Sequence, residues 1–300
     1  MKRVVFYCSW HHGDWHLAKS FIENFFLQFD KSGIECVAVT SRDPHIVNID
    51  RLKSEHITNW PRLMSNPPSF WDEGESTFYI NIWVGHHRLI GGDGGNHNFV
   101  NQIPMWKSIA DHIERETGFH LECIVNPELT VPNITSKMLG KYDKAPPNSV
   151  FFANSTPWSG QTLINSMPGA ILSLAEEFQN VNFICTQSIG IEKENIFYTN
   201  DMTNFENCGY NPLPEVAKIS EGCKIIVTNC SGPGTFAMTR YNFNCGNKTM
   251  IVLLANIELS PHTGVSHRNK IIFSSTYDEW EVGRIVREEI INKGMNKTND

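Results

Sequence analysis

The chain has 300 residues, of which 40% are hydrophobic and 19% are charged. Its 25 Lys and Arg against 32 Asp and Glu give a formal net charge of −7. This balance argues against a nonspecific nucleic-acid binder, because such proteins present a basic face to the phosphates, and we expect no stable nucleic-acid partner. The composition excludes a collagen, a coiled coil and a disordered chain. At about 150 residues per domain, the length predicts two domains.

The sequence also bears on the compartment. No run approaches the roughly 20 apolar residues of a membrane-spanning helix, so we expect no membrane span. The opening, MKRVVFYCSW, is typical of a buried strand rather than a signal peptide. The eight cysteines form no CxxC pair and mostly lie in or beside apolar runs, which favours reduced, partly buried thiols over disulfides. These features predict a cytoplasmic protein and leave its oligomeric state open.

The first half of the chain alternates apolar runs with amphipathic ones. Strands are predicted at 4–8, 34–40, 77–84 and 121–125, and helices at 17–29 and 106–117. Between the first strand and the first helix, residues 11–16 are predicted as a polar loop.

The second half repeats this rhythm. Strands are predicted at 150–153, 181–186, 196–198, 224–228, 250–254 and 271–274, and helices at 170–178, 214–220 and 279–292. Two such series predict an α/β fold with two Rossmann-like, doubly wound parallel sheets. The polar, proline-containing stretch 141–148 predicts the join, which gives domains at 1–143 and 144–300.

Ligands of doubly wound sheets bind beyond the carboxyl ends of strands. After the first strand come His11, His12, Gly13, Asp14 and His16. Gly13 permits a tight turn, and Asp14 has two interpretations. It either caps the first helix, or it acts as a general base with the neighbouring histidines orienting an acceptor.

His86 and His87 follow the third predicted strand and are expected at the same edge of the first sheet. Together with Asp14 and the histidines of the 11–16 loop, they raise the alternative of a metal-dependent hydrolase. The spacing His-His-x-Asp-x-His differs from the His-x-His-x-Asp-His pattern of metallo-β-lactamase-like enzymes. A catalytic zinc also needs three convergent protein ligands, so we expect no metal.

Two loops of the second half carry glycine and hydroxyl groups after strands. Residues 229–235 (NCSGPGT) form either a plain tight turn or a phosphate cradle made of backbone N–H groups. The stretch is neither a Walker A loop nor a GxGxxG motif. Residues 154–156 (NST) form either an ordinary loop or a second set of phosphate contacts.

Together these loops resemble those of GT-B glycosyltransferases, most of all the heptosyltransferase-type enzymes. In that family a Gly-Asp pair follows the first strand, as Gly13-Asp14 does here, and the family Asp is the catalytic base. The resemblance implies Asp14 as the base. The position of His12 beside Asp14 makes it a second catalytic candidate. The substrate-binding candidates are His11, Gly13, His16, His86 and His87.

The same family carries an Asp-Thr-Gly-x-x-His-like loop that binds the donor diphosphate. Residues 230–235 resemble it with the Ser231-Gly232 core kept, whereas Cys230 replaces the Asp and Thr235 replaces the His. Residues 154–156 match the family's hydroxyl-bearing phosphate contacts, and 196–201 resembles the strand beside the nucleoside base. The implied donor-binding residues are Asn154, Ser155, Thr156, Asn200, Asp201, Ser231, Gly232, Pro233, Gly234 and Thr235.

The resemblance implies two domains facing a cleft, with the acceptor bound by 1–143 and the nucleotide-sugar by 144–300. It implies a metal-independent transfer of a sugar from a nucleotide-sugar to an acceptor hydroxyl, with the nucleotide-sugar as co-substrate and no cofactor. The departures at Cys230 and Thr235 motivate the alternative of a noncatalytic nucleotide or nucleotide-sugar binding protein on the same scaffold.

Overall fold

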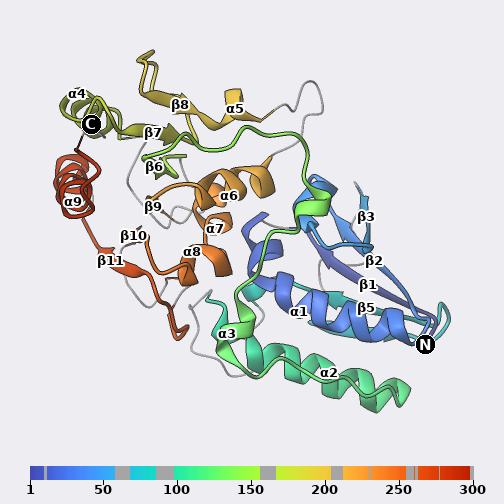
Figure 1. The fold of residues 1–300 in the computed structure, drawn as a ribbon. Coiled ribbons are helices and arrows are strands. Elements are labelled where there is room, and N and C mark those ends of the chain that lie inside the picture. Colours follow the sequence, from blue (N-terminus) through green and yellow to red (C-terminus); the bar gives the residue numbers. More distant parts are fainter. Residues whose placement is uncertain are drawn as a thin grey trace. The chain divides into compact units, whose positions relative to one another are not determined.

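The fold is taken from a computed structural model (Figure 1). It describes the chain except residues 10–11, 58–67, 86–97, 156–166, 204–211, 230, 255–259, 261–262, 277 and 298–300.

The chain divides into two compact units. The first comprises Met1–Met138 with Pro261–Ser266, and the second comprises Leu139–Ser260 with His267–Asp300. The division after Met138 precedes the expected boundary at 143 by a few residues. The reason lies in the expected join itself, since the Asp143 amide donates to the Met202 carbonyl oxygen at 2.7 Å and thereby belongs to the second unit.

The first unit contains a five-stranded sheet in the order β3-β2-β1-β5-β4, in which β4 alone is antiparallel. Its elements are β1 (Arg3–Cys8), α1 (His12–Lys31), β2 (Glu35–Thr40), the 3-10 helix η1 (Pro44–Val47), β3 (Lys53–His56), β4 (Ser69–Asp72), β5 (Thr77–Asn81), the 3-10 helix η3 (Val100–Gln102), α2 (Ile103–Thr117), α3 (Pro127–Thr130) and the 3-10 helix η4 (Ser136–Met138).

Side-chain alternation along the strands builds two apolar faces on this sheet. On one face, Val5 and Tyr7 of β1 form a buried cluster with Val37 and Val39 of β2. The other face meets α1 and α2, which lie side by side in Figure 1. Phe21 of α1 stacks on Trp106 of α2, with ring centroids 5.4 Å apart and an interplanar angle of 2°. The apolar stripes that predicted these helices therefore become the interior of the unit.

The strand predicted at 121–125 is absent from the described structure, where this stretch has no regular secondary structure. The side-chain amide of Gln28 on α1 explains the difference. Its Nε2 donates to the Glu122 carbonyl oxygen at 2.9 Å, and its Oε1 accepts from the Glu122 amide at 2.8 Å. Gln28 thus takes the place of a neighbouring strand. The unpredicted β3 and β4 are edge strands of only four residues each. β3 (KSEH) has no apolar residue, and β4 (SFWD) is too short to show a clear alternation.

The second unit contains a six-stranded, all-parallel sheet in the order β11-β10-β9-β6-β7-β8. Its elements are β6 (Ser149–Phe152), α4 (Pro168–Glu177), β7 (Asn182–Cys185), β8 (Ile196–Tyr198), α5 (Thr199–Met202), α6 (Leu213–Glu221), β9 (Ile225–Thr228), α7 (Gly232–Phe236), α8 (Arg240–Asn244), β10 (Thr249–Leu253), β11 (Lys270–Ser274) and α9 (Glu279–Asn292).

Alternate residues of these strands point to opposite faces of the second sheet. Val150 and Phe152 of β6 join a large buried cluster with Ile171 of α4 and Val286 of α9. Helices α6, α7 and α8 form a separate group in Figure 1. The expected α/β class with two mostly parallel sheets is confirmed. That the two domains face one cleft stays a prediction.

The structure bears on the expectations about membrane spans and about the cysteines. None of the helices in the described residues combines the length and hydrophobicity that a membrane crossing requires. The cytoplasmic location stays a prediction. The six cysteines whose placement is described are free thiols, and burial raises the pKa of Cys185 to about 12.

Candidate functional site

The strand order of each sheet reverses at one point. In the first unit the chain runs from β1 outward to β2 and β3, and β5 lies on the other side of β1. In the second unit it runs from β6 outward to β7 and β8, and β9 lies on the other side of β6. A doubly wound sheet binds its ligand beyond the carboxyl ends of the strands at such a switch point. The predicted loops 11–16, 86–87, 154–156 and 229–235 follow these four strands.

Asp14 lies at the switch point of the first unit, in the first turn of α1. The helix begins at His12, five residues earlier than predicted, so His12, Gly13 and Asp14 are helical rather than part of a loop. Asp14 is 6% exposed, and the Cys8 thiol at the end of β1 donates toward its Oδ2 across 3.9 Å. A helix N-terminus stabilises a negative charge, so this position suits a carboxylate.

The predicted histidines take different positions. His12 is half-buried at the beginning of α1, as is Gly13. His16 is 1% exposed, and its ring packs edge-on against Phe99 with centroids 6.3 Å apart. His16 therefore lies in the interior of the unit. His11, His86 and His87 lie outside the described residues.

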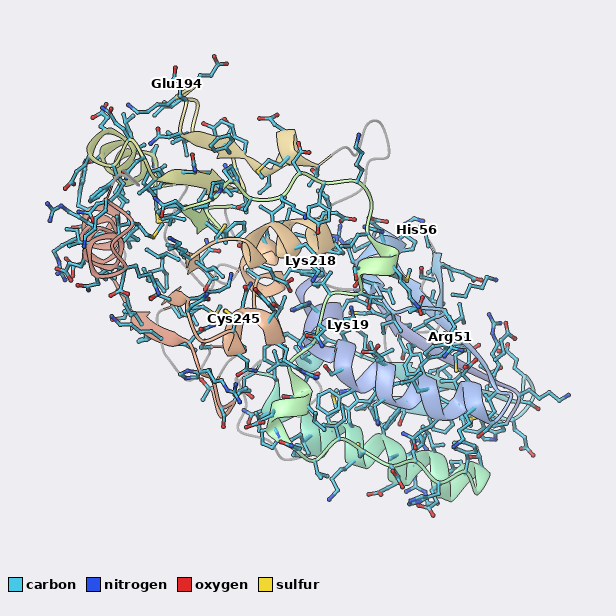
Figure 2. All side chains as sticks on the ribbon, in the orientation of Figure 1. Lys19, Arg51, His56, Glu194, Lys218 and Cys245 are labelled. Atoms are coloured by element: carbon cyan, nitrogen blue, oxygen red, sulfur yellow. The ribbon has the colours of Figure 1, made fainter. Side chains whose placement is uncertain are left out.

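Other polar residues lie at the carboxyl edge of the first sheet and were not predicted. The Asn81 Oδ1 at the end of β5 accepts from the Trp83 amide at 3.1 Å. The Ser41 hydroxyl donates to the Ser9 carbonyl oxygen at 3.0 Å, and His56, labelled in Figure 2, has its Nε2 3.3 Å from the Ser41 carbonyl oxygen. Their position at or directly after the carboxyl ends of strands was the signal that could have identified them.

At the switch point of the second unit, Asn154 and Ser155 connect β6 to the end of β7. The fully buried Asn154 side chain donates from Nδ2 to the Gln187 carbonyl oxygen at 3.0 Å. Its Oδ1 accepts from the Gln187 amide at 2.9 Å. The Ser155 hydroxyl lies 2.9 Å from the Thr186 hydroxyl, which places two half-buried hydroxyl groups at the sheet edge. Thr186 was not among the predicted site residues, and Thr156 lies outside the described residues.

The loop after β9 satisfies most of its own amides. The Ser231 amide donates to Asn229 Oδ1 at 3.1 Å, and the Gly234 amide donates to the Ser231 hydroxyl at 3.2 Å, which makes Ser231 the N-cap of α7. The Thr235 amide donates to the Ser231 carbonyl oxygen at 2.9 Å. Pro233 has no N–H. The expected open row of N–H donors is therefore reduced, in this described stretch, to the Gly232 amide.

The two loops beside this switch point are joined to each other. Asn229, the residue after β9, donates from Nδ2 to the Ser155 carbonyl oxygen at 3.2 Å. Gly234 is required for the close packing here, since a Cβ at this position would lie 2.1 Å from the Asn229 carbonyl oxygen. The structure thus brings Asn154, Ser155 and the 231–235 loop into one hydrogen-bonded region.

Asn200 and Asp201 lie elsewhere on the second sheet. Both are exposed in the short helix α5, which follows β8, and β8 is two strands away from β6. Neighbouring strands are about 4.8 Å apart, so these residues lie roughly 10 Å or more to the side of β6.

Within the described parts of the chain, no three side chains of His, Cys, Asp or Glu converge as a metal-binding group. His11, His86 and His87 lie outside those parts.

No protein-family profile matches the chain, and no curated protein matches its sequence. Among solved structures, the chain is similar to the glycosyl transferase family 9 structure from Veillonella parvula DSM 2008, with 13% identity and a TM-score of 0.43 over 96% of this chain and 89% of that one. It is similar to E. coli heptosyltransferase WaaC with ADP, with 12% identity and a TM-score of 0.46 over 97% and 99% of the two chains.

A third similar structure is a putative UDP-N-acetylglucosamine 2-epimerase from Listeria monocytogenes, with 8% identity and a TM-score of 0.46 over 99% of this chain and 89% of that one. At such identities and TM-scores, the similarities assign neither an activity nor a ligand to the chain. Its function has to be inferred from its own residues.

Proposed function

We propose that this chain is a glycosyltransferase that moves a sugar from a nucleotide-sugar to an acceptor hydroxyl, with Asp14 as the general base. The observation that carries the proposal is the position of Asp14, a buried carboxylate in the first turn of α1 at the switch point of the first sheet. The Gly13-Asp14 pair, which resembles that of heptosyltransferase-type enzymes, supports the same role.

The reaction requires a base on the acceptor side. As the acceptor oxygen attacks the anomeric carbon, its proton passes to the Asp14 carboxylate, and the bond between that carbon and the diphosphate oxygen breaks. His12 lies in the same helical turn as Asp14 and is proposed to orient the acceptor. General-base catalysis of this kind contributes about 10²- to 10⁴-fold to a rate.

The leaving diphosphate takes the electron pair of the broken bond, so its oxygens gain negative charge. On the donor side we assign this charge to the second unit, at the edge formed by Ser155, Ser231 and Thr235. The hydroxyl groups and the Gly232 amide are the hydrogen-bond donors that this edge offers, and donors aimed at developing charge lower the barrier. The other residues proposed to contact the nucleotide-sugar are Asn154, Thr156, Pro233, Gly234, Asn200 and Asp201. Of these, Asn200 and Asp201 are assigned to the nucleoside. No metal or cofactor enters this scheme.

The test is release of a nucleoside diphosphate from ADP-, UDP-, GDP- and dTDP-sugars, measured for the wild type, Asp14→Asn and Asp30→Asn. Asp30 lies on the same helix, at a surface ion pair with Arg51, and is the matched control. We expect Asp14→Asn to lower kcat by about 10²-fold or more, with Asp30→Asn unchanged. Unchanged turnover in Asp14→Asn would remove Asp14 as the base. A wild type that turns over none of these donors would contradict the transferase assignment.

One observation favours a second candidate, a noncatalytic nucleotide-binding protein. The amides of Ser231, Gly234 and Thr235 donate to acceptors on Asn229 and Ser231, and Cys230 and Thr235 replace the Asp and His of the family loop. This candidate predicts that a nucleotide raises the melting temperature while no donor is consumed.

A further inference from the structure

We propose that Asn229 is the positioning residue of the donor site: it holds the loop after β6 and the loop after β9 at the separation that the nucleoside diphosphate requires. The inference rests on the proposed function, because it assumes that the second unit binds a nucleotide-sugar. Asn229 belongs to neither of the loop matches that carry the family resemblance.

The Asn229 side chain makes one bond to each loop. The residue is 2% exposed and directly follows β9. Its Nδ2 donates to the Ser155 carbonyl oxygen at 3.2 Å, and its Oδ1 accepts from the Ser231 amide at 3.1 Å. Strands β6 and β9 are neighbours in the sheet, with Phe152 opposite Val227. One amide group therefore spans the switch point, with its donor on one side and its acceptor on the other.

The backbone of Asn229 also packs closely against the first turn of α7. A Cβ on Gly234 would lie 2.1 Å from the Asn229 carbonyl oxygen and 3.2 Å from its amide nitrogen. The first turn of α7 thus packs directly against the Asn229 peptide, and no room is left for a side chain at position 234. Asn229 contacts the loop after β6 through its side chain and the first turn of α7 through its main chain.

The bond to Ser155 has a consequence for the hydroxyl groups at the sheet edge. Ser155 carries the hydroxyl that lies 2.9 Å from Thr186, and Thr186 also donates to Asn154 Oδ1 at 3.4 Å. Holding the Ser155 peptide therefore holds the Ser155–Thr186 pair relative to Ser231. Loss of the Asn229 bond frees the Ser155 peptide to move and changes the distance between these hydroxyl groups.

The substitution Asn229→Asp separates positioning from turn formation. Aspartate keeps an oxygen for the Ser231 amide, but it places a second oxygen where Nδ2 faced the Ser155 carbonyl. The bond across the switch point becomes a repulsion, while the turn at 229–231 is kept. Asn229→Ala removes both bonds without adding charge. Asn182→Asp is the matched control, because Asn182 Nδ2 donates to the Pro147 carbonyl oxygen at 2.7 Å beside the amino end of β7.

The experiment measures the Kd for ADP, UDP, GDP and dTDP by calorimetry, the KM and kcat for the donor that the wild type uses, and the melting temperature. We expect Asn229→Asp and Asn229→Ala to raise Kd and KM by about tenfold, with a smaller change in kcat. A tenfold change corresponds to the loss of about one hydrogen bond between the protein and the charged diphosphate. Asn182→Asp should leave Kd and KM unchanged.

An unchanged Kd in both Asn229 variants, or an equal rise in Asn182→Asp, would overturn the positioning role while leaving the proposed function intact. A wild type that binds none of the four nucleotides overturns the proposed function and this inference with it. Should the variants fail to fold, hydrogen exchange of the wild type decides. The bound nucleotide must slow exchange at Ser155 and at Ser231–Thr235 together, and protection of one loop without the other overturns the inference.

Discussion

Gly234→Ala tests the packing that defines the loop after β9. A Cβ at this position would lie 2.1 Å from the carbonyl oxygen of Asn229 and 3.2 Å from its carbonyl carbon and amide nitrogen. The obstructing atoms belong to the backbone at the end of a buried strand, so no side-chain rotation relieves the contact. Either the first turn of α7 or the end of β9 has to move by at least about 1 Å, because Cβ atoms essentially never lie closer than 3.0 Å to another heavy atom.

Two contributions set the magnitude. Overpacking of a closed interior costs about 1–3 kcal/mol. The displacement also stretches the bond from the Gly234 amide to the Ser231 hydroxyl, now 3.2 Å long, and loss of such a cap costs about 0.5–2 kcal/mol. We expect the free energy of unfolding of the second unit to fall by about 2–4 kcal/mol, which for a unit of this size lowers its melting temperature by roughly 5–15 °C.

Gly232→Ala is the matched control, two residues away in the same loop. A Cβ there would meet Leu213 Cδ1 at 3.5 Å, an ordinary contact, so we expect a change within about 1 kcal/mol. Calorimetry and urea unfolding of the two variants give the comparison. Equal stability of Gly234→Ala and Gly232→Ala would refute the reasoning, since it would mean that the Asn229 peptide does not limit the position of α7.

Two further predictions concern buried charges of the second unit. Lys248 is 4% exposed, and its Nζ donates to the carbonyl oxygens of Ser220, Glu221 and Cys223 at 3.3, 2.6 and 2.6 Å. Lys248→Met should therefore lower the free energy of unfolding by about 2–4 kcal/mol in urea titrations, against a change within about 0.5 kcal/mol for the exposed Lys224→Met; equal effects would contradict this. Burial raises the pKa of Glu289, but hydrogen bonds from Lys270, Thr249 and Asn292 together lower it by more. The pKa of Glu289 therefore lies below the ordinary value of 4.5. The ionised Glu289 therefore stabilises the fold above about pH 4.5, and this stabilisation is lost as the pH falls through the folded-state pKa. The difference in melting temperature between wild type and Glu289→Gln should shrink from pH 7 to pH 3.5. A constant difference would show that the ionisation of Glu289 is not the origin of the stabilisation.

Local patterns predicted most of the regular elements. The apolar stripe predicted a helix at 279–292, and α9 spans Glu279–Asn292. The strand predicted at 196–198 is β8. Such elements depend on side-chain periodicity within a few residues, and their bounds can be read without knowing their neighbours. The stretch 121–125 shows the limit of this approach, because the main-chain amide and carbonyl of Glu122 bind the side chain of the distant Gln28 instead of a strand.

The sequence pattern predicted where some candidate residues lie, and their roles stay predictions. Polar residues after apolar runs indicated Ser155 and Ser231 in the loops after β6 and β9, and Asp14 between β1 and the main part of α1. The sequence could not show that His16 is buried against Phe99. The sequence included Asn229 in the 229–235 loop, but it could not show that its side chain binds Ser155, a partner 74 residues away.

The sequence by itself determined that the chain forms two series of alternating strands and helices with polar loops after the strands, since periodicity and turn residues are local properties. The tertiary structure decided which strands are neighbours, and with them the switch points between β1 and β5 and between β6 and β9. It also decided that the loop after β9 uses most of its amides itself and is joined to Ser155 through Asn229. These features depend on contacts between residues far apart in the chain, and such contacts exist only once the sheet has assembled.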